Sequence, residues 1–132
     1  MAETVLRFVT QTTHRPYGYR SGVFQIAYEL GRGHPTTSGL GGELAEQLAW
    51  FEENLAAPAR LSVSRHPRAQ ETAVSWVKAS AGEHVRRLRL LAALVEGMSD
   101  TRLDELRTTR PGYVVFEDAH QVVALPFNDT PR

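Results

Sequence analysis

"GYVVFEDAHQVVALPF", residues 112–127, is the stretch that decides the fold class. Two runs rich in valine and aromatic residues, 112–117 and 121–127, are separated only by the Asp-Ala-His of residues 118–120. Such runs favour β-strands, and so short a connection predicts an antiparallel hairpin. A further strand-like run, "DELRTTR" (104–110), comes just before it. The C-terminal part of the chain is therefore predicted to form three consecutive strands.

The N-terminal half alternates strand and helix signals. "VLRFVTQ" (5–11) is rich in β-branched residues and predicts a first strand, and "RLSVS" (60–64) predicts another short one. A helix is expected from an N-cap at Ser21 to Leu30, and a second one at about 43–56. The intervening stretches 12–20 and 33–42 contain proline and glycine and are expected to be connectors.

The region after Pro67 carries the longest helical pattern. On a helical wheel a set of residues falls within about a 90° sector. This set is Ala73, Val77, Ala81, His84, Leu88, Leu91 and Val95. Ser80 and Glu83 have capping-box spacing, so the pattern predicts either two helices, 67–79 and 81–96, or one kinked helix.

Together these elements predict an α+β (mixed α/β) fold. We expect a single small sheet of four or five strands, helices packed mainly on one face, and a C-terminal β-hairpin. The 132 residues suit one globular domain, 1–132, with 128–132 as a short tail.

Composition narrows the function classes. There is no cysteine, which excludes disulfides and thiolate chemistry. No apolar stretch approaches the roughly 18 residues of a membrane span, and the acidic N-terminus is unlike a secretory signal. We therefore expect a soluble, intracellular, cytoplasmic protein that does not bind membranes. The five histidines lack metal-site spacing, so neither a metal nor another cofactor is predicted.

The zero net charge hides an uneven layout. Residues 60–89 contain seven cationic side chains and only Glu71 and Glu83 as acids, a net charge of +5. Residues 27–58 contain five glutamates and only Arg32 as a cation, a net charge of −4. A basic middle suits an anionic partner, although complementary packing within the protein would need the same charges.

"SRHPRAQETA" (64–73) is the first candidate site. Pro67 suits the first position of a helix. Arg65 and Arg68 flank that helix start, where exposed backbone N–H groups and the helix dipole favour an anion. The same arginines could equally be solvated residues at a helix start.

"THRPYGYRSG" (13–22) is the second candidate. It combines Arg15 and Arg20 with Tyr17 and Tyr19, which offer donors and stacking faces to a partner. If strands 5–11 and 60–64 were parallel neighbours, both candidate loops would leave the sheet at one rim. One anionic surface would then be bound by four arginines, Arg15, Arg20, Arg65 and Arg68. The alternative interpretation is that residues 13–22 form an ordinary surface loop.

Residues 64–73 also resemble the second motif of the histidine phosphatase superfamily, on the strength of Arg68, Ala69, Thr72 and Ala73. That resemblance implies phosphoester chemistry at a phosphorylated histidine. The first motif of the family, Arg-His-Gly directly after the first strand, is replaced by Gln11 and Thr12. A degenerate site would leave His14 and His84 as the catalytic candidates, while His84 is also a candidate core histidine.

We expect a non-enzymatic binding or accessory module that contacts an anionic partner, either nucleic acid or an acidic protein surface, through this basic rim. The alternative is a small phosphoester-type enzyme. A third hypothesis is an accessory subunit that docks on a protein through an aromatic residue such as Trp50, because Trp50 and Phe51 are adjacent on one helix and cannot both face the same core.

Overall fold

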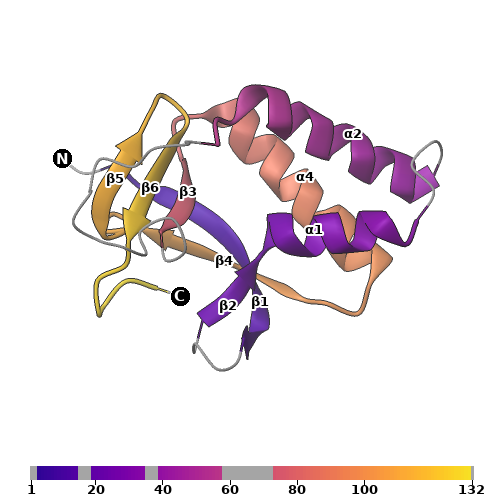
Figure 1. The fold of residues 1–132 in the computed structure, drawn as a ribbon, viewed down its shortest axis with the longest axis horizontal. Coiled ribbons are helices and arrows are strands. Elements are labelled where there is room, and N and C mark those ends of the chain that lie inside the picture. Colours follow the sequence, from indigo (N-terminus) through magenta and orange to yellow (C-terminus); the bar gives the residue numbers. More distant parts are fainter. Residues whose placement is uncertain (1–2, 15–18, 35–38, 58–72, 132) are drawn as a thin grey trace.

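The computed structural model describes residues 3–14, 19–34, 39–57 and 73–131, and all statements below refer to these ranges. They contain three helices and six strands (Figure 1). The helices are α1 (Val23–Arg32), α2 (Gly39–Asn54) and α4 (Gly82–Met98). The strands are β1 (Val5–His14), β2 (Tyr19–Gly22), β3 (Val74–Lys78), β4 (Leu103–Thr108), β5 (Tyr113–Glu117) and β6 (Gln121–Leu125).

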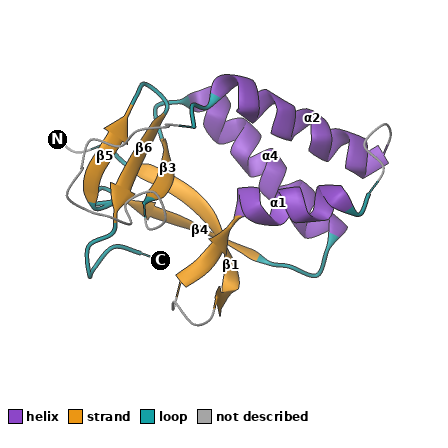
Figure 2. Cartoon of the chain, viewed as in Figure 1, coloured by secondary structure: helices purple, strands orange, loops and turns teal. Residues whose placement is uncertain are grey.

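The six strands form one curled sheet with the order β2-β1-β3-β6-β5, and β4 pairs with β1 (Figure 2). Every described strand pair is antiparallel. Because β4 pairs with β1 from Val5 to Thr10, β2 and β3 share the opposite edge of this long strand, at its two ends. β1 therefore pairs with three other strands, β2, β3 and β4, and brings their residues close together.

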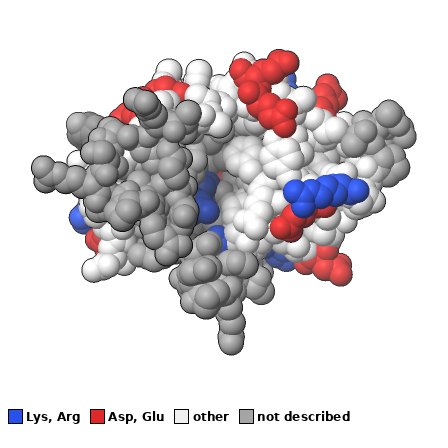
Figure 3. Space-filling view, viewed as in Figure 1, with Lys and Arg blue, Asp and Glu red and all other residues white. Residues whose placement is uncertain are grey.

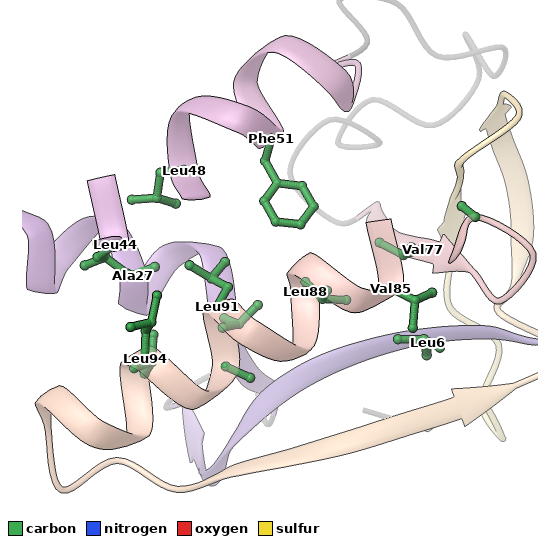
Figure 4. Packing of buried hydrophobic residues seen from close by; sticks show 14 residues of the cluster. Leu6, Ala27, Leu44, Leu48, Phe51, Val77, Val85, Leu88, Leu91 and Leu94 are labelled. Carbon is green, nitrogen blue, oxygen red and sulfur yellow. The ribbon is translucent and has the colours of Figure 1, made fainter. Parts of the chain in front are cut away.

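One face of the sheet packs against the helices. Leu6 of β1 and Val77 of β3 are register partners on this face, and both belong to the main core. The helices contribute Leu44, Phe51 and other side chains to the same cluster (Figure 4). Each fully buried side chain of this size contributes about 1.5–3 kcal/mol, so this layer holds the sheet and helices together.

The opposite face of the sheet has its own smaller apolar cluster. Val5, Trp76, Val122 and Ala124 are buried there, and none of the three described helices contributes a residue to the cluster. β3 is buried on both faces, because Trp76 lies in this cluster and Val77 in the main core.

The predicted α+β class is confirmed, and so is the C-terminal hairpin, in which Val114 pairs with Ala124. The helix predicted at about 43–56 corresponds to α2, whose apolar residues from Leu44 to Phe51 are buried. The described sheet has six strands, close to the four or five that were predicted. The additional strands come from segments that the sequence pattern had suggested to be helix and loop.

The predicted helix at 67–79 is wrong over the part that the structure describes, because Val74–Lys78 is β3. Its apolar residues fit a helical wheel, yet they are β-branched or aromatic and suit a strand buried on both faces. The second predicted helix, 81–96, corresponds to α4. The capping box is not formed, because Ala81 is the N-cap and the Glu83 carboxylate binds Arg86 and Arg87.

The predicted connector at 12–20 is shorter than expected. β1 continues to His14, and β2 begins at Tyr19 and pairs with it. The first helix begins after Gly22 rather than Ser21 and has no side-chain cap. Extended pairing on the edge of β1 has overridden the local turn signals.

Near the C-terminus, residues 127–130 form a hydrogen-bonded turn. The buried Thr130 hydroxyl accepts the Phe127 N–H at 2.9 Å and donates to the Arg110 carbonyl at 3.2 Å. None of the helices in the described ranges has both the length and the apolar character that crossing a bilayer requires.

Candidate functional site

Several predicted site residues lie outside the described residues, namely Arg15, Tyr17, Arg65 and Arg68. His14 and Tyr19 end β1 and begin β2, and they are register partners there. The predicted strand at 60–64 also lies outside the described ranges. The shared rim of the two basic loops therefore stays a prediction.

Asp104 of β4 connects three strands. The Arg20 guanidinium, projecting from β2, pairs with the Asp104 carboxylate at 2.6 Å. Gln11 of β1 donates to the other oxygen of Asp104 at 3.1 Å. The hydrogen bonds from Gln11 and Arg20 lower the pKa of Asp104, so this carboxylate stays ionised and both its oxygens have donors.

Arg7 lies beside this group and was not among the predicted site residues. Strand alternation places Arg7 of β1 on the same sheet face as Trp76, away from the helices. The guanidinium carbon lies 5.5 Å from the Trp76 ring centroid. Burial, and to a lesser degree the charge of Arg20, lowers the pKa of Arg7 to about 10. Both causes mean that its charge is poorly stabilised where it sits.

Among the described residues no carboxylate pairs with Arg7, whereas other cations of the chain have acidic partners. Lys78 pairs with Glu117 at 2.6 Å, and Arg89 with Glu105 at 3.2 Å. The positive segment found in the sequence is thus largely neutralised where it is described. In the space-filling view, acidic side chains gather over α2, and cationic atoms are visible near the middle of this face, beside the helical layer (Figure 3).

Trp76 brings a buried hydrogen-bond donor to the same face. Its side chain is 1% exposed, and its Nε1–H has no hydrogen-bond partner within the described part of the chain. Arg7 and Trp76 thus form a donor-only pair, which suits an acceptor such as an anion.

His84, the catalytic candidate on the long helix, is buried as the apolar stripe suggested. Its Nε2–H donates to the Asn54 carbonyl at the end of α2, at 2.7 Å. Its ring stacks on His120 of the β5–β6 turn, with centroids 4.1 Å apart and planes inclined by 17°. These contacts tie α4 to α2 and to the hairpin.

Trp50, the predicted partner contact, is half-buried under α4. Its ring lies 4.8 Å from His84, and the Arg87 guanidinium lies 4.5 Å from its centroid. Phe51 is buried in the main core, and Trp50 packs against the same core with its ring centroid 5.1 Å from that of Phe51. The expectation that the two aromatic residues could not both face one core is therefore wrong.

No cluster of three or more histidine, aspartate or glutamate side chains that could hold a metal occurs in the described ranges. His84 and His120 are close, but nearly parallel stacked rings point their lone pairs side by side rather than toward one common ion.

The sequence prediction did not include Arg7 because it relied on segments in which several charged residues lie close together in the sequence. The available signal was a lone arginine inside an otherwise apolar strand, in "VLRFV" (5–9). Trp76 was missed because its segment was assigned to a helix.

Compared with known proteins, the chain matches no family model, no curated protein and no solved structure.

Proposed function

We propose that this chain is a non-enzymatic binding or accessory domain that holds an anionic group of a partner against the sheet face opposite the helices. The observation that carries the proposal is Arg7, a half-buried guanidinium with no carboxylate partner among the described residues. Arg20 lies close enough to lower the pKa of Arg7 further.

A buried cation without a counter-charge costs free energy, and proteins normally pair such groups. Asp104 is already engaged by Arg20 and Gln11. Because the carboxylate of Asp104 is already engaged, a bound anion would supply the negative counter-charge that Arg7 lacks. Such an anion would stabilise the domain and mark the point of contact.

An acidic protein surface fits these charges better than nucleic acid. The total net charge is zero, whereas domains that bind nucleic acid are usually basic. Arg86 and Arg87 of α4 both bind Glu83, so that helix offers little uncompensated positive charge. One localised cationic group is sufficient for a carboxylate or phosphorylated side chain.

The test is fluorescence anisotropy with a labelled polyglutamate peptide, and separately with a single-stranded oligonucleotide of the same charge, at increasing sodium chloride. We expect the peptide to bind more tightly, with an affinity that falls as salt rises. Arg7→Gln should weaken binding by about tenfold or more, as expected when a charge-assisted hydrogen bond is lost.

Arg32→Gln is the matched control, because it removes the same charge from an exposed position at the end of α1. Equal losses in both variants, or no binding of the peptide, would reject the proposal. Preferential binding of the oligonucleotide would replace the acidic protein by nucleic acid. An Arg65→Ala/Arg68→Ala variant tests whether the predicted rim contributes.

The enzymatic alternative is separated by a second assay. Turnover across a panel of phosphoesters, abolished in His84→Ala or His14→Ala, would contradict a non-enzymatic role.

A further inference from the structure

Trp76 is the residue that specifies the chemistry of the site. It lies on β3, with β1 on one side and β6 on the other, and its register partner on β6 is Val122. Buried donors almost always have an acceptor. Within the described residues the Nε1–H of Trp76 has none, although its side chain is 1% exposed.

Arg7 adds further donors over the face of the Trp76 ring. Its contact with Trp76 engages the face of the ring, at 5.5 Å from the guanidinium carbon. A cation–π contact uses the charge of the guanidinium and leaves its N–H groups to be satisfied. Neither side chain can accept a hydrogen bond, so the pair selects a ligand that only accepts.

The acids that the structure describes on this face of the sheet already have partners. Asp104 binds Arg20 and Gln11, and Glu117 binds Lys78. An external acceptor is therefore the group that would complete the site.

We infer that Arg7 and Trp76 form an oxyanion-binding site, in which a carboxylate or phosphate group accepts hydrogen bonds from the guanidinium and from the indole Nε1–H together. This inference rests on the proposed function and names the anionic group that the site takes. A carboxylate would come from an acidic side chain of the partner, and a phosphate from a phosphorylated one.

The indole N–H of Trp76 can be observed directly. In the full chain labelled with ¹⁵N-tryptophan, the two tryptophans give two indole cross-peaks in a ¹H–¹⁵N spectrum. A Trp50→Phe variant assigns them. Sodium phosphate and sodium acetate are titrated separately at pH 7, with sodium chloride adjusted to keep the ionic strength constant.

We expect the Trp76 indole proton to shift downfield and saturate with one of the two anions, while the Trp50 peak stays in place. The anion that saturates at the lower concentration identifies the carboxylate or the phosphate. Arg7→Gln should abolish the shift. Arg7→Lys keeps the charge but lacks the guanidinium fork, and it should weaken binding by about tenfold, which provides a second variant if the glutamine protein does not fold.

A stationary Trp76 peak with both anions would overturn the inference, as would a shift that is unchanged in a folded Arg7 variant. If the Trp76 peak does not move but polyglutamate still binds in an Arg7-dependent way, the proposed function stands and the indole has no part in it. If neither occurs, both fail.

Discussion

The ion pair between Arg20 and Asp104, at 2.6 Å, connects β2 to β4 across the strand that carries Arg7. Asp104 is the register partner of Val9, which lies two residues from Arg7 on β1 and therefore on the same face of the sheet. This pairing lets two arginines share one face, and it leaves the charge of Arg7 to be met by another group.

Asp104→Asn should therefore strengthen anion binding at Arg7. The substitution removes a negative charge beside the site and leaves Arg20 without this counter-ion. We expect tighter binding of polyglutamate in the anisotropy assay. Asp129→Asn is the control, because it makes the same charge change at the exposed Arg110 pair. Equal tightening in both variants would mean that only the total charge matters.

Glu83 should contribute stability that is lost at low pH. Hydrogen bonds from Arg86 and then Arg87 lower the pKa of Glu83 to about 2, from an ordinary value of 4.5. Because the unfolded chain takes up this proton first, the contribution is present above pH 4.5 and disappears as the pH falls toward 2.

Urea unfolding of the wild type and Glu83→Gln at a series of pH values measures this. The difference in unfolding free energy should be largest at neutral pH and vanish near pH 2. Glu46→Gln, on the exposed side of α2, should show little difference at any pH. A Glu83→Gln difference that does not depend on pH would refute the assignment.

His84→Phe should destabilise the fold without changing anion binding. Phenylalanine retains an aromatic ring but cannot donate to the Asn54 carbonyl, and an unpaired buried polar group costs about 1–3 kcal/mol. Urea unfolding at pH 7 gives this value, with His34→Phe at the exposed end of α1 as the control. If His84→Phe had the same free energy of unfolding as the wild type, this hydrogen bond would not contribute to stability.

Tyr28 should lose its phenolic proton at a higher pH than an ordinary tyrosine. Burial, the hydrogen bond to Glu52 at 2.6 Å and the charge of that carboxylate raise the pKa of Tyr28 to about 12. Since the unfolded chain loses this proton near pH 10, stability should fall between pH 10 and 12. Tyrosinate absorbance of the wild type minus Tyr28→Phe reports the ionisation, and Glu52→Gln should move it toward pH 10. An unchanged curve in Glu52→Gln would contradict the role of the hydrogen bond.

The hairpin and the two clearest helices could be predicted because their signals are local. The runs on either side of residues 118–120 are rich in valine and aromatic residues and are joined by a short turn, and the apolar residues of α2 from Leu44 onward follow the helical period. β3 could not be predicted in this way, since a strand buried on both faces lacks the alternation that identifies a strand. The order of apolar residues around Trp76 and Val77 is compatible with both the helical period and the strand period.

The candidate site was even less accessible to sequence reasoning. Arg7, Arg20, Trp76 and Asp104 come from four strands that are distant in the chain and meet only through antiparallel pairing over β1. Local patterns carry no information on such pairing. The basic segment at 60–89 indicated an anion site through its charge, but its helical members are paired with acids of the protein.

The central claim is that an anion binds at Arg7, and ligand-dependent stability tests it most directly. Unfolding free energies of the wild type and Arg7→Gln are measured while sodium phosphate or sodium succinate replaces chloride at constant ionic strength. For the wild type, one of these anions should raise the free energy by about 1.4 kcal/mol per tenfold increase in concentration above its Kd, and Arg7→Gln should not respond. The same rise in both proteins, or no rise in the wild type with either anion, would contradict the account.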